Sequence, residues 1–394
     1  MTTNEHSAPY PAEFDDIAPY GEHNYYDKLV ALTKEPGFEH AVRFIMPGVD
    51  YDAFCERLLA VTSQKEFQGK IMGDFLNRLE QYSTAGITAS GVGNIDHKCS
   101  YTFISNHRDI VLDASFLNLV MLRNNLPVTQ IAIGNNLLIY DWITDLVKIN
   151  RSFIVKRDVK KLEALNAARH LSGYIHHAIT ESHESVWIAQ REGRAKDSND
   201  RTQESLVKML SFSGGGDTRH NLLELNLVPV AISYEFDPND YLKVREFLLK
   251  RRDPSFKKSQ HDDLFSMETG LTGFKGRVHF HIGECINSRL AECPCEQRGE
   301  AVHVTCSLID KSIHCGYHFF PINYVAYDRL TGSDTFADKY DSAEVKVVEE
   351  YLDRQLAKVD VPDITAEERE FMMQLMYTMY ANPVKNQIAA RQQE

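Results

Sequence analysis

The stretch YTFISNHRDIVLDASFLNLVMLRNN, residues 101–125, decides the fold class because a polar turn joins two kinds of element in it. YTFIS (101–105) is a short apolar run of the kind that forms a buried strand, and ASFLNLVMLRNN (114–125) has the length and apolar content of a helix. Between them lies the polar and charged segment SNHRD. A strand that leads directly into a helix is the repeating unit of α/β proteins.

The same alternation continues along the chain. Further strands are predicted at 129–134, 152–156, 185–189, 226–235 and 276–283, and further helices at 137–148 and 159–180. This pattern indicates an α/β fold with a mostly parallel sheet and flanking helices. In such sheets the ligand crevice lies at the carboxyl ends of the strands. The SNHRD segment begins where the strand 101–105 ends, so it is predicted to lie in that crevice.

Helical patterns flank this region on both sides. Residues 22–83 and the chain after about residue 330 carry apolar residues at helical spacing. TAGITASGVGNIDHK (84–98) has the Gly, Ser and Thr content of a linker. We therefore expect an N-terminal helical region (1–85), an α/β domain (86–330) and a helical C-terminal tail (331–394).

The His-Arg-Asp sequence at 107–109 fits two kinds of chemistry. It begins the catalytic loop of protein kinases, in which an Asn five residues after the Asp holds a magnesium ion. Ala114 stands at that position, no Asp-Phe-Gly follows, and no Gly-rich strand-turn-strand precedes the site, so the kinase interpretation fails. The alternative is that His107 is a general base held by a nearby carboxylate.

Three later segments become interpretable together with His107. KINRSFIVKR (148–157) surrounds a strand with cations, EGR (192–194) follows another strand, and LVPVAISYE (227–235) is a strand with a proline near its start. The order of these blocks resembles that of the glycerolipid acyltransferase family, which includes glycerol-3-phosphate and 1-acylglycerol-3-phosphate O-acyltransferases. The resemblance covers roughly residues 95–240, and it extends to 285 if FHIGECIN (280–287) matches the family's late strand.

The resemblance implies a role for each block. His107 matches the catalytic histidine, which removes the proton from an acceptor hydroxyl as that hydroxyl attacks a thioester. The family places an Asp five positions after this His, where Leu112 stands here. Asp113 is therefore favoured as the carboxylate that orients His107, and the alternative is Asp109, which would otherwise cap the following helix.

The resemblance also implies a set of residues that bind the acceptor. They are Arg151, Lys156, Arg157, Glu192, Gly193 and Arg194. Arginine suits this role because its planar fork of donors matches a phosphate group. The family's Glu-Gly-Thr-Arg form is shortened here to Glu-Gly-Arg, so the identity of the acceptor does not follow from this block.

Composition argues against several other classes of protein. A net charge of -13 at pH 7 argues against general nucleic-acid binding, which depends on phosphate neutralisation by Lys and Arg. The sequence shows no signal-peptide pattern and no apolar run near the roughly 18 residues of a membrane span, so we expect a cytoplasmic protein, free or peripheral on the inner membrane face. The 7 cysteines are typical of reduced thiols, and Cys-x-Cys at 293–295 is not a zinc spacing. Neither a metal nor a cofactor is expected.

The run KVREFLLKRRDPSFKK (243–258) is rich in basic residues in an otherwise acidic chain. It predicts either a solvated helix face or a docking patch for an acidic acyl carrier protein or an anionic membrane surface.

With the resemblance, we expect an O-acyltransferase of phospholipid synthesis. It would move a fatty acyl group from an acyl thioester of CoA or acyl carrier protein to a hydroxyl of glycerol 3-phosphate or 1-acylglycerol 3-phosphate, that is, to a polyol-phosphate or lysolipid acceptor. One alternative is acylation of a non-glycerol hydroxyl, in an aminolipid or hydroxy acid. The other is an inactive lipid- or phosphate-binding protein on the same fold.

Overall fold

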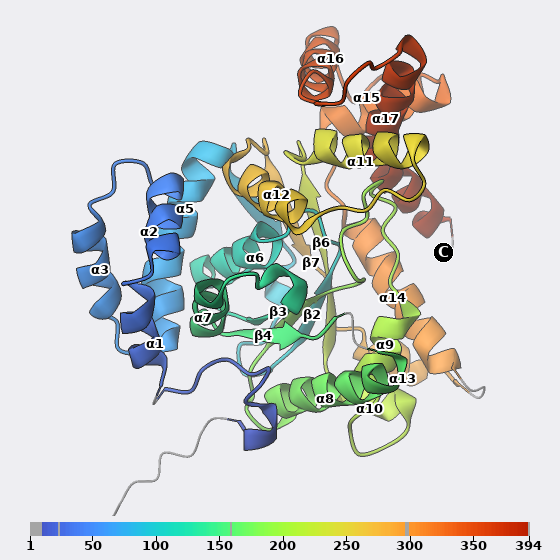
Figure 1. Cartoon of the computed structure of the whole chain (residues 1–394). Coiled ribbons are helices and arrows are strands. Elements are labelled where there is room, and N and C mark those ends of the chain that lie inside the picture. Colours follow the sequence, from blue (N-terminus) through green and yellow to red (C-terminus); the bar gives the residue numbers. More distant parts are fainter. Residues whose placement is uncertain (1–9, 23, 158–159, 296–298, 393–394) are drawn as a thin grey trace, which may run out of the picture.

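A seven-stranded sheet lies at the centre of the computed structural model, which describes residues 10–22, 24–157, 160–295 and 299–392 (Figure 1). The strands are β1 (Ile87–Ser90), β2 (Thr102–Ser105), β3 (Gln130–Gly134), β4 (Ser152–Val155), β5 (Val186–Ala189), β6 (Leu227–Tyr234) and β7 (Val278–Ile282). Their order across the sheet is β1-β7-β6-β2-β5-β3-β4. The strands from β6 to β4 run parallel, whereas β7 is antiparallel to β6 and β1 is parallel to β7. The predicted α/β fold with a mostly parallel sheet is confirmed.

The edge strand β1 lies in the segment whose composition predicts a linker. Ile87 is opposite Val278 and Ser90 is opposite His281, in parallel register. Gly91 follows with a φ of 71°, and a Cβ there would come within 2.0 Å of the carbonyl oxygen of Ile282. Only glycine fits such a left-handed position beside another backbone. The linker expectation is thus wrong for 87–90, because small residues form a strand here.

Helices cover both faces of the sheet and bury two apolar clusters against it. One face packs on α5 (Gly73–Ser83) and α6 (Leu112–Arg123). The opposite face packs on α8 (Lys161–Thr180), α9 (Glu204–Leu210), α10 (Thr218–Glu224), α13 (Asn287–Glu292) and α14 (Glu300–Gly316). The helix predicted over 159–180 corresponds to α8, although residue 159 lies outside the described residues. Such two-sided cover is what a parallel sheet requires.

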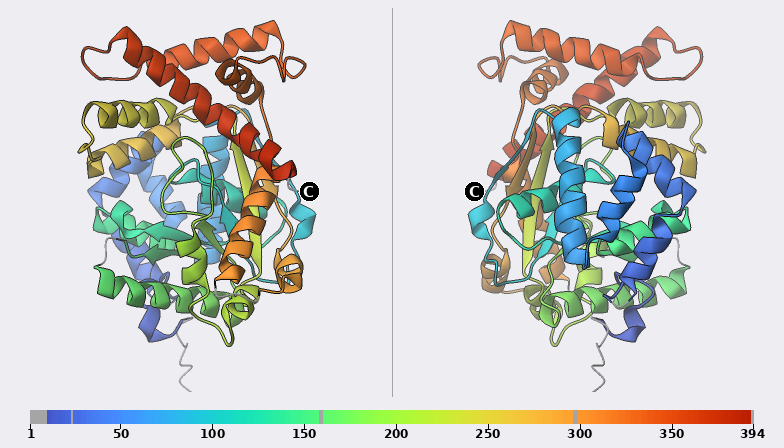
Figure 2. Two further views of the ribbon diagram at one scale, coloured as in Figure 1. Left: turned by 90° about the vertical axis from the view of Figure 1, so that its right-hand side faces the viewer. Right: turned by 90° about the vertical axis from the view of Figure 1, so that its left-hand side faces the viewer.

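Two further helical clusters flank this core, as Figure 2 shows. The N-terminal cluster comprises α1 (Tyr25–Leu32), α2 (Pro36–Ile45), α3 (Tyr51–Leu59), α4 (Gln64–Glu66) and η2 (Phe67–Met72), and it packs on α7 (Asp141–Ile149). The C-terminal cluster comprises α15 (Pro321–Thr331), α16 (Ser342–Leu356) and α17 (Ala366–Arg391). The expected helical N- and C-terminal regions are therefore present, and the division into domains stays a prediction. Among the described helices, none has both the length and the apolar content that a bilayer crossing requires.

A long excursion of the chain, residues 235–277, connects β6 to β7. It contains α11 (Asp240–Arg252), which packs on the C-terminal cluster, and α12 (Gln260–Thr272). Its two ends are joined, because Glu235 N donates to Arg277 O at 2.9 Å. The Arg277 guanidinium also donates to both carboxylate oxygens of Glu235, at 3.0 and 2.7 Å. Because β6 and β7 are antiparallel, the excursion leaves and rejoins the sheet on the side where the parallel strands have their carboxyl ends.

Candidate active site

The chain leaves the sheet after β2 at Asn106. Asn106 Nδ2 donates to Ile232 O at 2.9 Å, and Ile232 N donates to Asn106 Oδ1 at 2.8 Å. The Asn106 side chain thus satisfies backbone groups of β6 that a longer β2 would otherwise pair with. The main chain is free to turn at this point, and His107 lies immediately beyond the carboxyl end of β2.

His107 forms a hydrogen bond with Asp113. His107 Nδ1 lies 2.8 Å from Asp113 Oδ2, and Asp113 is fully buried in the first turn of α6. The same oxygen accepts the backbone N–H groups of Arg108 at 2.6 Å and Asp109 at 3.1 Å, so the carboxylate is fixed in place. If Nδ1–H donates to this carboxylate, Nε2 of the neutral imidazole carries the free lone pair.

The imidazole of His107 is held from a second side by Trp187 of β5. The two ring centroids lie 5.8 Å apart in an edge-to-face arrangement. Trp187 is itself fixed, because its Nε1 donates to Ser105 Oγ at 3.0 Å. The side chain of His107 keeps 13% of its surface exposed, and that surface lines a cavity. Part of the imidazole is therefore accessible from the cavity.

Asp109 has a different role from Asp113. Its Oδ1 accepts Val111 N at 2.9 Å and Leu112 N at 2.8 Å, so it closes the turn that begins α6. Its other oxygen, Oδ2, is buried with no hydrogen-bond partner in the described part of the chain. Burial raises the pKa of Asp109, and the buried ammonium of Lys275 opposes this effect. The structure therefore pairs His107 with Asp113 and places Asp109 at a helix start.

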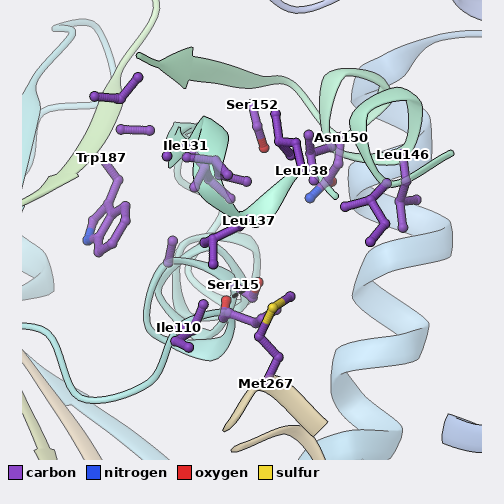
Figure 3. Close-up of a pocket in the computed structure, with 18 of the residues that line it drawn as sticks. Ile110, Ser115, Ile131, Leu137, Leu138, Leu146, Asn150, Ser152, Trp187 and Met267 are labelled. Carbon is purple, nitrogen blue, oxygen red and sulfur yellow. Dashed lines mark hydrogen bonds between the residues drawn. The ribbon is translucent and has the colours of Figure 1, made fainter. Parts of the chain in front are cut away.

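The cavity beside His107 has a volume of about 1250 Å³. Apolar side chains from the sheet, α6, α7, α12 and the N-terminal cluster make up most of its wall, and Figure 3 shows part of it. The residues labelled there are Ile110, Ser115, Ile131, Leu137, Leu138, Leu146, Asn150, Ser152, Trp187 and Met267. Typical small-molecule sites measure roughly 300–1,000 Å³, so this cavity has room for a long apolar ligand.

Three of the predicted acceptor-binding residues line this cavity together with His107: Lys156, Arg157 and Glu192. Arg157 Nε lies 3.9 Å from Glu192 Oε1, a loose ion pair. Lys156 forms an ion pair with Asp16, which precedes the N-terminal cluster. The strand ends of β4 and β5 thus place two cations and a carboxylate in the cavity that contains His107.

The other three residues of the predicted set are placed elsewhere, and for Arg151 this is a correction. Arg151 precedes β4, so it lies at the amino ends of the parallel strands, whereas His107 lies at their carboxyl ends. The guanidinium of Arg151 contacts Glu184 and Gln68. This buried side chain cannot also hold an acceptor near His107. Arg194 and Gly193 do not line the cavity. Gly193 has a φ of 69°, which fits a turn position, and the charge of Arg194 acts on buried Asp237.

The sequence interpretation missed a buried ion pair beside the histidine. Arg108 donates to both carboxylate oxygens of Asp200, with Nη1–Oδ1 at 3.3 Å and Nη2–Oδ2 at 2.7 Å. Tyr317 Oη donates to the same carboxylate at 2.5 Å. This pair ties the loop of His107 to the loop that follows β5. Sequence spacing gives no signal for it, because its partners are about 90 residues apart.

The basic run 243–258 is largely neutralised by neighbouring carboxylates. Lys243 pairs with Asp237, Lys250 with Glu246, Arg251 with Glu367, Arg252 with Glu368, Arg245 with Asp262, and Lys258 with Glu246 and Asp263. Most cations of the run therefore have carboxylate partners in the described chain, and a docking role for this run stays a prediction.

The arrangement of His, Cys, Asp and Glu side chains shows whether a metal ion could be held. Within the described ranges, no cluster of three or more His, Cys, Asp or Glu side chains is arranged to hold a metal ion. His279 and His281 on β7 instead share hydrogen bonds with Ser90 of β1.

Comparisons with known proteins give a distant structural likeness. No family model matches the sequence, and no curated protein matches it. Among solved structures, the chain is similar to the 1-acyl-sn-glycerophosphate (LPA) acyltransferase PlsC from Thermotoga maritima. The identity is 15%, the TM-score is 0.38, and the alignment covers 72% of this chain and 94% of that one. A likeness at this level leaves the function to be argued from the site.

Proposed function

We propose that this protein is an O-acyltransferase that moves a fatty acyl group from an acyl thioester to a hydroxyl of a phosphorylated glycerolipid precursor. The donor would be acyl-CoA or acyl carrier protein, and the acceptor glycerol 3-phosphate or 1-acylglycerol 3-phosphate. The observation that carries the proposal is the 2.8 Å hydrogen bond from His107 to a buried carboxylate beside a large apolar cavity. We also propose that the reaction takes place in the cytoplasm or at the inner membrane face.

The arrangement suits acyl transfer for a chemical reason. His107 Nε2 can accept the proton of the acceptor hydroxyl while the hydroxyl oxygen bonds to the thioester carbonyl carbon. The resulting tetrahedral adduct expels the thiolate as the carbon–sulfur bond breaks, and the imidazolium returns the proton to the sulfur. Asp113 stabilises the imidazolium form of His107 during the reaction, because the negative charge of its carboxylate stays next to Nδ1–H.

The cavity and its charged end support the choice of substrates. A fatty acyl chain gains about 0.8 kcal/mol for each methylene group that it buries, so an apolar cavity of this size favours a long chain. Arg157 and Lys156 lie in the same cavity wall and can attract a phosphate group.

One alternative keeps a specific observation in its favour. Arg194, which the resemblance assigns to the acceptor's phosphate, does not line the cavity. An acceptor hydroxyl without a glycerol phosphate, as in an aminolipid or hydroxy acid, would need no such residue. The case for an inactive binding protein depended on the displaced Asp, and the hydrogen bond to Asp113 weakens that argument.

The decisive experiment is a thiol-release assay with product analysis by mass spectrometry. The purified chain receives palmitoyl-CoA or palmitoyl acyl carrier protein with glycerol 3-phosphate, 1-acylglycerol 3-phosphate, a lyso-aminolipid or a hydroxy acid. We expect acceptor-dependent thiol release and an ester product with a glycerol phosphate acceptor. His107→Ala should lower the rate by on the order of 10²–10⁴-fold while circular dichroism stays unchanged. Ester formation that persists in folded His107→Ala would contradict the proposal, and ester formation only with a non-glycerol acceptor would replace it with the alternative.

A further inference from the structure

Arg191 lines the cavity that contains His107. Gln190 N donates to Ser105 O at 2.8 Å, so the chain after β5 continues alongside the chain after β2. β5 and β2 are neighbours in the sheet, so Arg191 and His107 follow the carboxyl ends of adjacent strands, and both residues line the cavity.

The backbone on both sides of Arg191 is fixed by one residue. Gln203 N donates to Gln190 O at 3.0 Å, and Glu192 N donates to Gln203 Oε1 at 2.6 Å. A cation on such a constrained loop loses little further freedom when it binds a ligand.

Among the lysines and arginines that line the cavity, Arg191 is the one without a carboxylate partner in the described chain. Arg194 also has a buried donor without an acceptor, Nη1, but it does not line the cavity. Arg108 pairs with Asp200, and Arg157 lies within 3.9 Å of Glu192. Lys156 pairs with Asp16. Arg191 forms no ion pair with any described residue, and its Nε is buried without an acceptor. A buried donor on a charged group that lacks a partner destabilises the protein, so a bound anion would supply what the folded chain does not.

We propose that Arg191 binds a phosphate group of the substrates in the cavity, in place of the Arg194 that the family resemblance points to. This inference rests on the proposed function, because the phosphate is that of the acceptor or of the CoA donor. A guanidinium binds either through charge-assisted hydrogen bonds that are often bidentate. Lysine at this position retains the charge but not the planar fork of donors.

The test compares Arg191→Gln and Arg191→Lys with the unaltered enzyme, and uses Arg169→Gln as a matched control. Arg169 is an exposed arginine on α8 outside the cavity wall. The acceptors are 1-acylglycerol 3-phosphate and 1-acylglycerol, and the donors are palmitoyl-CoA and palmitoyl-pantetheine. Circular dichroism and the unfolding midpoint report whether each variant is folded.

A charged hydrogen bond contributes about 1.5–3 kcal/mol, which corresponds to a tenfold to hundredfold change in binding. Arg191→Gln should therefore raise KM for one phosphorylated substrate at least about tenfold, Arg191→Lys less, and Arg169→Gln less than about twofold. A loss confined to 1-acylglycerol 3-phosphate assigns the contact to the acceptor, and a loss confined to palmitoyl-CoA assigns it to the donor. Equal losses with and without phosphate on both substrates would overturn the inference.

A binding measurement tests the role of Arg191 independently of whether the protein transfers acyl groups. Calorimetry compares 1-acylglycerol 3-phosphate, 1-acylglycerol and CoA on the unaltered chain and on Arg191→Gln. If the unaltered chain transfers no acyl group, the proposed function fails, yet a phosphate-dependent difference in affinity would still support the role of Arg191. Equal affinity of the two proteins for every phosphorylated ligand would refute it.

Discussion

The hydrogen bond to Asp113 occupies Nδ1 of His107 and leaves Nε2 as the nitrogen that can act as a base. Three donors converge on the same carboxylate oxygen, namely the imidazole and two backbone N–H groups of the turn. Neutral imidazole has one donor and one acceptor nitrogen, so fixing the donor fixes the base. The geometry of a short turn thereby selects a tautomer.

Asp113→Asn should lower kcat by on the order of 10²–10⁴-fold, because the amide carries no charge to stabilise the imidazolium. KM for the acceptor should change little, since Asp113 is fully buried and does not line the cavity. Steady-state kinetics at saturating donor measures both quantities. A variant whose kcat stays within about threefold of the unaltered enzyme would show that Asp113 does not assist the base.

Asp109→Ala tests the other carboxylate. Loss of the two hydrogen bonds at the start of α6 should lower the free energy of unfolding by about 0.5–2 kcal/mol. A further loss should follow because the buried ammonium of Lys275 would lack its nearby charge. Urea unfolding measures the stability, and kcat should fall less than in Asp113→Asn. A larger fall in kcat would make Asp109 the more important acid.

The sequence could identify His107 and its two candidate acids, because all three lie within seven residues. It favoured Asp113 over Asp109 from the order of residues in the resemblance, but it could not establish the hydrogen bond, because that contact depends on where α6 begins. The same reasoning assigned Arg151 to the acceptor, although its side chain is buried away from the cavity, and it gave no reason to single out Arg191, which lines the cavity. A cation such as Arg151 can be paired with a carboxylate that is distant in sequence, here Glu184. The spacing of residues along the chain does not reveal such pairs.

Among the elements, β1 is the one that pattern reasoning missed. Its partner strand lies about 190 residues later, and ITAS is neither strongly apolar nor flanked by a helix of the repeating unit. Side chains reinforce the pairing: His279 accepts or donates to Thr88 Oγ1 at 2.8 Å and to Ser90 Oγ at 2.9 Å. The His318 ring lies 4.8 Å from the His279 ring. Strands with a helix beside them were predictable, whereas an edge strand held by distant contacts was not.

This edge should be sensitive to acid. Burial, with smaller contributions from His318 and His281, lowers the pKa of His279 to about 4. The unfolded chain therefore binds more protons than the folded chain between about pH 6.5 and pH 4, and stability should fall as the pH drops through that window. Each pH unit involves at most about 1.4 kcal/mol, and partial exposure of His279 reduces this.

His279→Gln should flatten the acid side of the stability curve, because glutamine keeps polar contacts but takes up no proton. Urea midpoints at pH 7, 6 and 5 for both proteins provide the measurement. His97→Gln serves as the control, since His97 is exposed on the 84–98 segment. Parallel curves for the His279→Gln and unaltered proteins would mean that another group causes the acid response.

For the whole molecule, the cavity is formed by parts of the chain that lie far apart in sequence. His107, which follows β2, and side chains of the N-terminal cluster, such as Ala41 of α2, line the same cavity. No single segment of the sequence indicates a cavity, because the cavity forms only when these distant segments pack together. The sequence alone could therefore not predict it. The size of the cavity near α2 should determine which acyl chains fit.

Ala41→Phe should shift the preference of the enzyme toward shorter acyl-CoA donors, because the new ring occupies space that a long chain would fill. Each methylene that loses its contact weakens binding by about 0.8 kcal/mol, or roughly fourfold. The ratio of kcat/KM for C10, C14 and C18 donors measures the shift. Ala31→Phe, at an exposed position of α1, is the control. Unchanged ratios in Ala41→Phe would mean that the acyl chain lies elsewhere.

The antiparallel pairing of β6 with β7 has a consequence for how this protein can be altered. Residues 235–277 leave and re-enter the sheet at adjacent positions, about one strand spacing of 4.8 Å apart. A tight turn would satisfy the connectivity of the sheet equally well, so the excursion is not needed to join its strands. Yet Met267, Glu268 and Leu271 of this excursion form part of the cavity wall. These wall residues can therefore be substituted without breaking the β6–β7 pairing, whereas the segment as a whole is also held by the packing of α11 on the C-terminal cluster and by Lys275 near Asp109.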